Sequence, residues 1–408
     1  MTDVVAPTLT AAEVAAARAR TPGCDTDAVV HLNHAGSSLP PRSVLDVQVS
    51  HLREEARIGG YEAAAAATER RHAVYDSIAE LIGARPQEIA RTEHATAAWN
   101  AAFWSVPMEA GQRIVVHDHE YGANIVAFLH AAETRGVVID RIGNAPSGAI
   151  DVDAVADRVG RGDVALVSLT HIPTNGGLVN PAAEVGRVTT AAGVPFLLDA
   201  CQSVGQRALD VNELGCDFLS ATGRKFLRGP RGTGFLYVRD AMLERVQPSQ
   251  PDHHGADLVA ADRFVWADGA QRFEYWEHDV AAWLGLGAAV DEALALGTRR
   301  IEPTVERRAT ELRALLDDAG FTVHDEGDVR CGIVTTSRAG HDSVELREHL
   351  VANGINCTTT PAGSSRWDVD RRSLPTLLRL SVHYTTTADE LARCMEVLDS
   401  ITSRGPEA

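Results

Sequence analysis

The sequence predicts an α/β fold: a large domain built on a mostly parallel sheet, followed by a smaller C-terminal α+β domain. Three observations support this prediction. Between about residues 75 and 240, short apolar segments alternate with helical patterns, as they do in βαβ units. Beyond about residue 295, the order becomes strand, helix, strand, helix. A hydrophobic share of 45% over 408 residues is enough for a large core.

The N-terminal residues 1–25 include an Ala-rich stretch, and we expect a helix or arm that packs on the small domain. The large domain is expected to cover residues 26–294. Short apolar runs predict its buried strands at 114–116, 137–139, 164–169, 194–198, 218–220 and 235–238. A helix should lie between two of them, with Asn180 as N-cap, Pro181 at the first helical position and Gly193 just past its end. Functional groups in such sheets gather at the carboxyl ends of the strands.

The small domain is expected to cover residues 295–408. An apolar, Ala-rich helix over 281–297 leads into it, and a second helix is expected over 301–316. The remaining strands and helices are predicted at 332–336, 343–353, 377–382 and 388–401.

Charge and cysteine usage narrow the functional class. A net charge of −18 and a pI near 5.3 argue against a partner that needs a basic face, such as nucleic acid or an anionic membrane. The six cysteines are scattered without a CxxC pair, which favours a reducing compartment. There is no apolar signal-like segment and no apolar run near the ~20 residues of a membrane span. We therefore expect a cytoplasmic protein.

The cationic side chains are almost all arginines: Lys225 is the only lysine among the 38 lysines and arginines. A GC-rich genome explains why lysine is scarce, but it does not explain why one lysine remains at this position. Only the primary amine of lysine can lose its proton and form a Schiff base, so Lys225 is the first candidate for chemistry.

Lys225 follows one predicted strand, and Asp199 ends another. Pyridoxal 5'-phosphate needs such a pair: a lysine that holds its aldehyde and a carboxylate that keeps its ring nitrogen protonated. The alternative is a solvated basic turn beside an unrelated buried aspartate. On these two segments alone, both interpretations remain open.

Neighbouring segments favour the cofactor. Ala95 and Thr96 lie where a helix is expected to begin, and free N–H groups at such a site suit a phosphate. Tyr121 follows a strand and could stack on a pyridine ring. His117 and His119 could suggest a metal, but this pair has no further ordered ligands, so no metal is expected.

With these segments in order, the chain resembles the fold-type I enzymes of the class V aminotransferase family, which bind pyridoxal phosphate. That family includes cysteine desulfurases, isopenicillin N epimerase-like proteins and C–S lyases such as the sulfoxide lyase of ergothioneine synthesis. The resemblance runs from residues 32–41 (LNHAGSSLPP) to 378–384 (LRLSVHY). It implies an amino-acid substrate and a homodimer with active sites near the interface between the two copies of the chain.

The resemblance assigns roles to individual residues. The lysine of the family's S-x-H-K motif falls on Lys225, with Thr222 and Arg224 in place of Ser and His. The D-A-x-Q motif places Asp199 at the ring nitrogen and Gln202 near the phenolic oxygen. The other roles that it implies are a phosphate cradle at Ala95 and Thr96, a stacking ring and catalytic side chain at Tyr121, a ring contact at Thr174 or Asn175, and a clamp for the substrate carboxylate at Arg379.

Two departures from the family pattern, and one further segment that resembles the ergothioneine C–S lyase, bear on the reaction. Cysteine desulfurases carry a nucleophilic cysteine on a loop before the carboxylate-binding arginine, and residues 358–374 contain none. Trp276 stands near the place where many relatives have a Gly-Thr pair, and it could shape the substrate pocket or pack at an interface. Tyr61 is expected to line the substrate mouth with Asn33 and His34, unless its segment is only a helix end at Gly59.

These features favour β-elimination from a cysteine S-conjugate, giving pyruvate and ammonia. An aminotransferase is the alternative, followed by an epimerase or a decarboxylating deaminase. A non-catalytic binding protein would need neither Lys225 nor Asp199.

Overall fold

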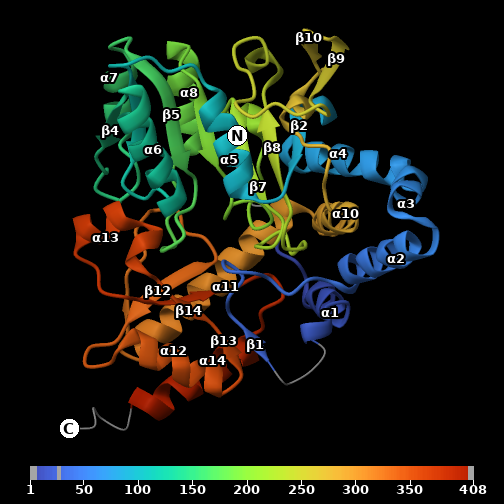
Figure 1. Ribbon diagram of the computed structural model, residues 1–408. Helices are drawn as coiled ribbons and strands as arrows, with labels where there is room; N and C mark the ends of the chain where they lie inside the picture. Colours follow the sequence, from blue (N-terminus) through green and yellow to red (C-terminus); the bar gives the residue numbers. More distant parts are fainter. Residues whose placement is uncertain (1–6, 25–28, 403–408) are drawn as a thin grey trace.

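A seven-stranded sheet forms the centre of the large domain in the computed structural model, which describes residues 7–24 and 29–402 (Figure 1). In spatial order the strands are β2 (Ile89–Thr92), β8 (Gly234–Val238), β7 (Phe218–Thr222), β6 (Phe196–Asp199), β5 (Val164–Thr170), β3 (Arg113–His117) and β4 (Val138–Ile142). Only β8 runs antiparallel to its neighbours. The predicted mostly parallel α/β sheet is therefore confirmed.

Helices cover both faces of this sheet, because successive strand residues point to opposite sides. Ile114 and Val116 pack with α5 (Ala95–Ser105) and α6 (Gly122–Arg135). Val115 belongs to the core on the other face. The helices of that second face are α4 (Thr68–Ile82), α7 (Val152–Val159), α8 (Ala182–Ala192), α9 (Val211–Leu214) and α10 (Val280–Leu296).

The C-terminal part contains a four-stranded antiparallel sheet, drawn in orange and red in Figure 1. Its strands are, in spatial order, β11 (Thr322–Val323), β12 (Ile333–Ser337), β15 (Leu378–Ser381) and β14 (Thr358–Thr359). Its helices are α11 (Thr298–Asp318), α12 (Ser343–Ala352), α13 (Arg366–Arg372) and α14 (Ala388–Thr402). The predicted smaller α+β unit is present, with a hydrophobic core of its own.

The N-terminal segment binds to this C-terminal part. Helix α1 (Ala11–Ala19) forms ion pairs from Glu13 to Arg300 at 2.6 Å and from Arg18 to Glu390 at 2.9 Å. The short strand β1 (Val30–His31) pairs in parallel with β13 (Ile355–Asn356). Residues 1–6 and 25 of the expected arm lie outside the described residues, and the division at 26–294 and 295–408 remains a prediction.

One helix start differs from the prediction. Helix α8 begins at Ala182, so Pro181 is the N-cap and not the first helical residue. Asn180 does not cap the helix, because its side chain has tertiary partners: its amide nitrogen donates to the carbonyl of Thr170 and its oxygen accepts from the N–H of Ile150.

The remaining elements lie at the periphery. Helices α2 (Arg42–Ile58) and α3 (Gly60–Ala66) lead into α4, and a hairpin of β9 (Ala256–Ala260) and β10 (Arg263–Trp266) projects from the large domain (Figure 1). Five short 3-10 helices complete the described chain: η1 (Pro22–Cys24), η2 (Pro86–Glu88), η3 (Asp240–Met242), η4 (Ala270–Phe273) and η5 (Ala362–Ser364). Within the described ranges no single helix is long and apolar enough to span a membrane. Helices α10 and α11 together have the length and composition of a span, but the pair is bent by 83°.

Candidate active site

A cavity lies at the carboxyl ends of the central strands. Asp199 is the last residue of β6, Thr222 the last of β7 and Thr170 the last of β5. The residues that line the cavity are His94, Ala95, Thr96, Trp99, Tyr121, Asn124, Thr170, Ile172, Thr174, Asp199, Cys201, Gln202, Thr222, Arg224 and Lys225. The structure thus brings together the predicted cofactor contacts, with Asn175 buried next to Thr174 but outside this lining.

Lys225 lies in the turn after β7 and is 8% exposed. Burial lowers the pKa of its amine, and the charge of Arg224 acts in the same direction. Burial is the larger of these two causes. A lowered pKa leaves more of the amine neutral, and the neutral amine is the nucleophile.

Asp199 faces the cavity with a defined orientation. Its Oδ1 accepts a hydrogen bond from the N–H of Cys201 at 3.0 Å, and its Oδ2 accepts one from Asn124 Nδ2 at 3.0 Å. Burial raises the pKa of Asp199, while these two hydrogen bonds and the charge of Lys225 lower it. Both donors favour the ionised carboxylate.

The N-terminus of α5 borders the same cavity. His94 is the N-cap, and its Nδ1 accepts from the N–H of Ala97 at 3.0 Å. The first N–H groups of a helix have no acceptor within the helix, and the helix dipole is positive there. Ala95 and Thr96 therefore present a site suited to a phosphate, and their contact with the cofactor remains a prediction.

Arg379 reaches the cavity wall from β15. Its Nη1 donates to the carbonyl of Thr174 at 2.9 Å and to Thr174 Oγ1 at 3.1 Å, and its Nη2 lies 3.5 Å from Asn33 Oδ1. Burial lowers the pKa of Arg379 to about 10, and the charge of Arg224 adds to this effect. Its Nε is buried without a hydrogen-bond partner in the described chain, so the guanidinium retains a donor for a ligand.

None of the five predicted substrate contacts lines the cavity: Arg379 and Asn33 lie behind Thr174, and the other three lie further away. His34 is buried between the rings of His31 and His383, with centroids 4.8 and 5.1 Å away. Tyr61 is 75% exposed on α3, which starts just after a helix end at Gly59. Trp276 is 52% exposed and stacks on the ring of His253. Their roles toward substrate remain predictions.

The segment that replaces the cysteine-bearing loop of desulfurases is held firmly over α6. A Cβ atom on Gly122 would lie 2.2 Å from the carbonyl oxygen of Gly363, so two backbones meet directly beside Tyr121. Further along, Trp367 stacks on Phe128 with centroids 6.2 Å apart.

An ionic cluster fixes the same segment. Asp368 accepts from His119 Nε2 at 3.1 Å and from Arg371 at 2.6 Å, and Glu326 contacts the same two side chains at 3.1 and 3.0 Å. His119, Glu326 and Asp368 are close enough to bind a metal ion. The arginines already neutralise the carboxylates, so the cluster gives no reason to revise the expectation of no metal site.

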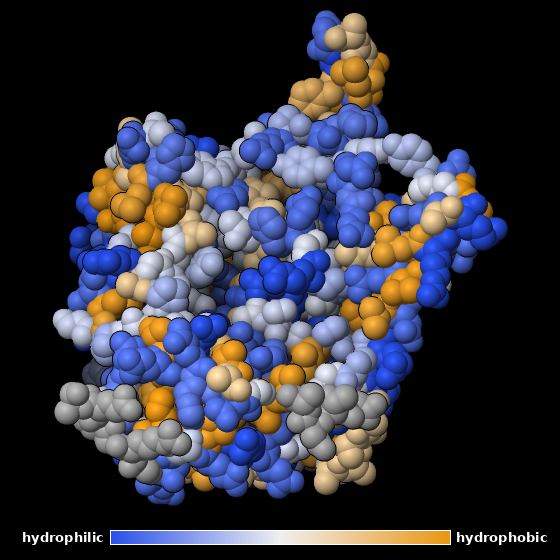
Figure 2. All heavy atoms as spheres, turned by 60° about the horizontal axis from the view of Figure 1, so that its bottom comes forward, coloured by the Kyte–Doolittle hydropathy of each residue, from blue (hydrophilic) through white to orange (hydrophobic). Residues whose placement is uncertain are grey.

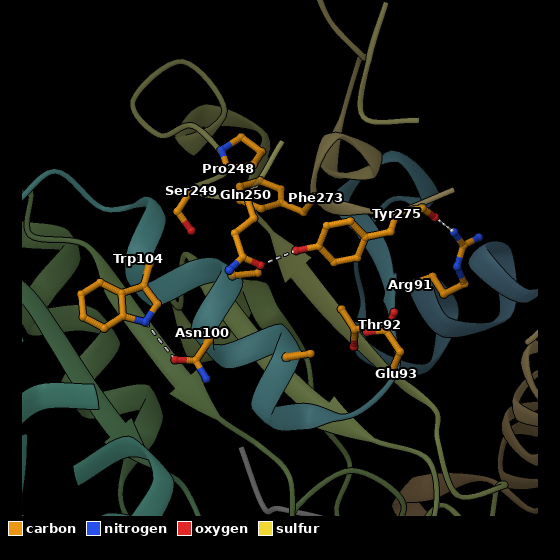
Figure 3. Close-up of a pocket in the computed structure, with 12 residues that line it drawn as sticks. Arg91, Thr92, Glu93, Asn100, Trp104, Pro248, Ser249, Gln250, Phe273 and Tyr275 are labelled. Atoms are coloured by element: carbon orange, nitrogen blue, oxygen red, sulfur yellow. Dashed lines mark hydrogen bonds between the residues drawn. The ribbon is translucent and has the colours of Figure 1, made fainter. Parts of the chain in front are cut away.

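A second cavity of about 170 Å³ lies on another face of α5 (Figure 3). There, Trp104 donates to Asn100 at 3.0 Å, and Tyr275 donates to Gln250 at 2.8 Å. These four side chains thus satisfy one another in pairs. In the first cavity, by contrast, Gln202 Oε1 is buried without a partner in the described chain. A buried polar atom of this kind indicates a missing ligand.

Sequence reasoning overlooked three residues of the site. Asn124 and Cys201 line the cavity, and Glu120 lies behind Asn124. The four-residue spacing of Glu120 and Asn124 at a helix start was the available signal. It did not reveal Asp199 as their common neighbour.

The residues present fit pyridoxal phosphate. A buried lysine, a carboxylate at a strand end, a helix N-terminus and an aromatic ring surround one cavity that contains an unpartnered amide oxygen. This combination defines a pyridoxal phosphate-dependent enzyme as the class of protein.

The chain belongs to the class-V aminotransferase family, since the family model described as "Aminotransferase class-V" matches residues 30–394. A probable cysteine desulfurase of Methanothermobacter thermautotrophicus is 27% identical over 92% of this chain and 95% of its own length. A probable hercynylcysteine sulfoxide lyase of Mycobacterium tuberculosis is 30% identical over 92% of this chain and 90% of its own length.

Solved structures share the fold. The apo cysteine desulfurase of Thermococcus onnurineus NA1 has a TM-score of 0.88 and 20% identity, covering 98% of this chain and 100% of that chain. A mutant of C-DES, solved with glycine covalently linked to its PLP cofactor, has a TM-score of 0.83 and 22% identity, covering 93% and 98%. Pyridoxal phosphate is the cofactor of this family and of this chain.

Proposed function

We propose that this protein is a C–S β-lyase that cleaves a cysteine S-conjugate to pyruvate, ammonia and a sulfur-containing fragment. The observation that carries the proposal is the segment from Thr358 to Leu374, which lies beside the cavity and contains no cysteine. A desulfurase stores sulfur on a thiol in that segment. Without such a thiol, the sulfur fragment leaves as a free product.

Cys201 does not replace that thiol. It lies in the cavity wall two residues after Asp199, the end of β6, and not in the segment from Thr358 to Leu374. Burial raises the pKa of its thiol, which disfavours the reactive thiolate.

The chain's own groups can perform the elimination. Pyridoxal phosphate, when bound to the substrate amine, withdraws electrons from Cα. Arg379 binds the substrate carboxylate and thereby orients Cα above Lys225. Lys225 Nζ then accepts the Cα proton as general base. The Cβ–S bond breaks, its electron pair leaves with sulfur, and the released 2-aminoacrylate reacts with water to give pyruvate and ammonia.

The similarity to a probable hercynylcysteine sulfoxide lyase supports a lyase that acts on a sulfur-substituted cysteine. The buried Arg379 and the closely packed segment over Tyr121 support a small-molecule substrate rather than a protein acceptor.

Two measurements test the proposal. Wild-type protein loaded with pyridoxal phosphate should show a yellow absorption band that borohydride bleaches, and Lys225→Ala should lack it. S-substituted cysteines should then yield pyruvate and ammonia in equal amounts without an amino acceptor. Keto acid formation that requires an acceptor would instead establish an aminotransferase, and racemised substrate would establish an epimerase.

We also propose a homodimer. The hairpin β9–β10 projects from the body and carries apolar side chains in solvent, as Figure 2 shows at its upper edge. These side chains are Leu258 (74% exposed), Val259 (48%), Phe264 (50%) and Val265 (54%). Exposed apolar groups of this kind mark protein interfaces. Light scattering should give twice the chain mass of 43.6 kDa, and a monomer at all concentrations would contradict the proposal.

A further inference from the structure

Glu120 is a fully buried carboxyl group, and among the described residues no cation forms an ion pair with it. Its Oε1 accepts from the N–H of Thr170 at 3.0 Å, and its Oε2 accepts from Thr170 Oγ1 at 2.8 Å. The third donor is Asn124 Nδ2, at 3.3 Å from Oε2. All three donors are neutral groups.

Asn124 links this carboxyl group to the cavity. The same Nδ2 atom also donates to Asp199 Oδ2 at 3.0 Å. Two carboxyl groups therefore share one amide nitrogen, and Asn124 is itself only 2% exposed. Asp199 Oδ1 accepts from the backbone N–H of Cys201. In the described chain, the Asn124 amide is therefore the only side chain that donates a hydrogen bond to Asp199.

Burial and the nearby negative charge favour the neutral form of Glu120, while its three hydrogen-bond donors favour the ionised form and only partly offset the burial. The groups that face it are Thr170 from β5, Asn124 from α6 and Asp199 from β6, and the only charge among them is negative. Burial raises the pKa of Glu120 to about 8, and the charge of Asp199 acts in the same direction. Lys225 acts on Asp199 and favours its ionisation. The two carboxyl groups thus disfavour each other's ionisation, and Lys225 favours the ionised form on the Asp199 side of the pair.

We propose that Glu120 and Asn124 are positioning residues: Glu120 holds the Asn124 amide against Asp199, and this keeps the Asp199 carboxylate ionised and directed at the cofactor's ring nitrogen. The proposal rests on the function proposed above, in which Asp199 stabilises the protonated ring. It explains why a second carboxyl group is buried near Asp199 although it does not line the cavity.

The test compares three variants with one control. Glu120→Gln keeps the shape of the neutral carboxyl group, Glu120→Ala removes it, and Asn124→Leu removes the shared N–H. The control is Glu88→Gln, in the residue directly before strand β2. Glu88 is also a buried carboxyl group, and it accepts backbone hydrogen bonds from Arg85 and Asp240. Circular dichroism identifies variants that do not fold.

The first readout needs no cofactor. In the apoprotein at neutral pH, the infrared difference between wild type and Glu120→Gln should contain the carbonyl stretch of a protonated carboxyl group, and this signal should titrate near pH 8. A spectrum with only a carboxylate at neutral pH would overturn the proposal, whatever the activity.

The second readout uses the loaded protein. Glu120→Ala and Asn124→Leu should shift the pH dependence of the cofactor's absorption and weaken pyridoxal phosphate binding by about 10-fold, as expected when an outer-shell partner is lost. Turnover should fall by about 10–100-fold while KM changes little. Glu120→Gln should restore near-normal values at neutral pH.

A merely structural role would give a different result. The control Glu88→Gln should keep the wild-type absorption titration. If Glu120→Ala and Asn124→Leu also keep that titration and only lose stability, the proposal is wrong. The proposed function fails separately, if wild type never shows the band that depends on Lys225. The two failures are therefore distinguishable.

Discussion

His119 and Glu120 are neighbours in the chain, but their side chains enter opposite electrostatic surroundings. His119 contacts Asp368 and Glu326 outside the cavity, where Arg371 supplies positive charge. Glu120 points inward to Asn124 and lies near Asp199. We call these the outer cluster (His119, Glu326, Asp368, Arg371 and Arg372) and the inner pair (Glu120 and Asp199).

The two regions show that burial alone does not set the charge of a carboxyl group. Burial raises the pKa of Asp368, yet His119 and the two arginines bring it down to about 2. Burial also raises the pKa of Glu120, and no cation opposes it, so the value reaches about 8. In the outer cluster, paired charges keep Asp368 ionised. In the inner pair, Glu120 has no such cationic partner among the described residues, so it can bind a proton near neutral pH.

The largest effect is expected from a substitution of Lys225, whose charge acts on Asp199 of the inner pair. Lys225→Arg keeps a positive charge but removes the titratable amine, so activity should fall by on the order of 10²–10⁴-fold. Pyruvate release measures this loss. Arg231→Lys, in the exposed part of the same turn, is the control and should leave activity unchanged. Equal activity of Lys225→Arg and wild type would remove Lys225 from the mechanism.

Breaking the outer cluster should lower stability. Asp368→Asn removes a buried carboxylate and leaves His119 and Arg371 with fewer counter-charges, at a cost of about 3 kcal/mol in the free energy of unfolding. Denaturant unfolding at neutral pH measures it. Asp370→Asn, on the same helix, breaks only an exposed pair with Arg366 and should cost less than about 1 kcal/mol. Similar costs for both would mean that burial of the cluster has no energetic consequence.

The inner pair should respond to pH instead. The folded-state pKa of Glu120 lies above the ordinary value of 4.5, so the folded state binds more protons than the unfolded state between 4.5 and about 8. Its contribution to stability is complete below 4.5 and is lost as pH rises through about 8. Glu120→Gln has no such proton, so its stability relative to wild type should increase over that window. If the difference in the free energy of unfolding between Glu120→Gln and wild type stays constant with pH, the raised pKa of Glu120 is contradicted.

The smallest effect is expected at Trp276, which belongs to neither region. Its ring is half exposed on His253, so Trp276→Ala should change the free energy of unfolding by no more than about 0.5 kcal/mol. The substrate KM should stay within a factor of about two if the residue only packs at the surface. A large rise in KM would instead place Trp276 at a substrate mouth in an assembled dimer.

The sequence predicted the central sheet and the core of the site for a common physical reason. Parallel strands end at one edge, so Asp199 and Thr222, at the ends of neighbouring strands, had to approach each other. Lys225 could be identified because its chemistry is unique among the cationic side chains of this chain. Local signals were sufficient for both inferences.

Features that depend on distant partners could not be predicted. Asn180 resembled a helix cap, but Thr170 and Ile150 take up its side chain. Glu120 and Asn124 were visible as a spaced pair, yet their meaning depends on Asp199, which is far away in the sequence. The contacts of Tyr61 with a substrate mouth were inferred by resemblance and are not formed within this chain's cavity.

The close approach of Gly122 and Gly363 has a consequence for the evolution of this family. A Cβ atom at position 122 would lie 2.2 Å from the carbonyl oxygen of Gly363, so position 122 admits no side chain while the loop over Tyr121 keeps its present course, whereas a Cβ atom at position 363 would meet nothing within 4 Å. Adding a cysteine to this loop would not recreate a sulfur carrier, because such a carrier must swing between substrate and acceptor. A change of chemistry would therefore require rebuilding the whole segment together with the start of α6.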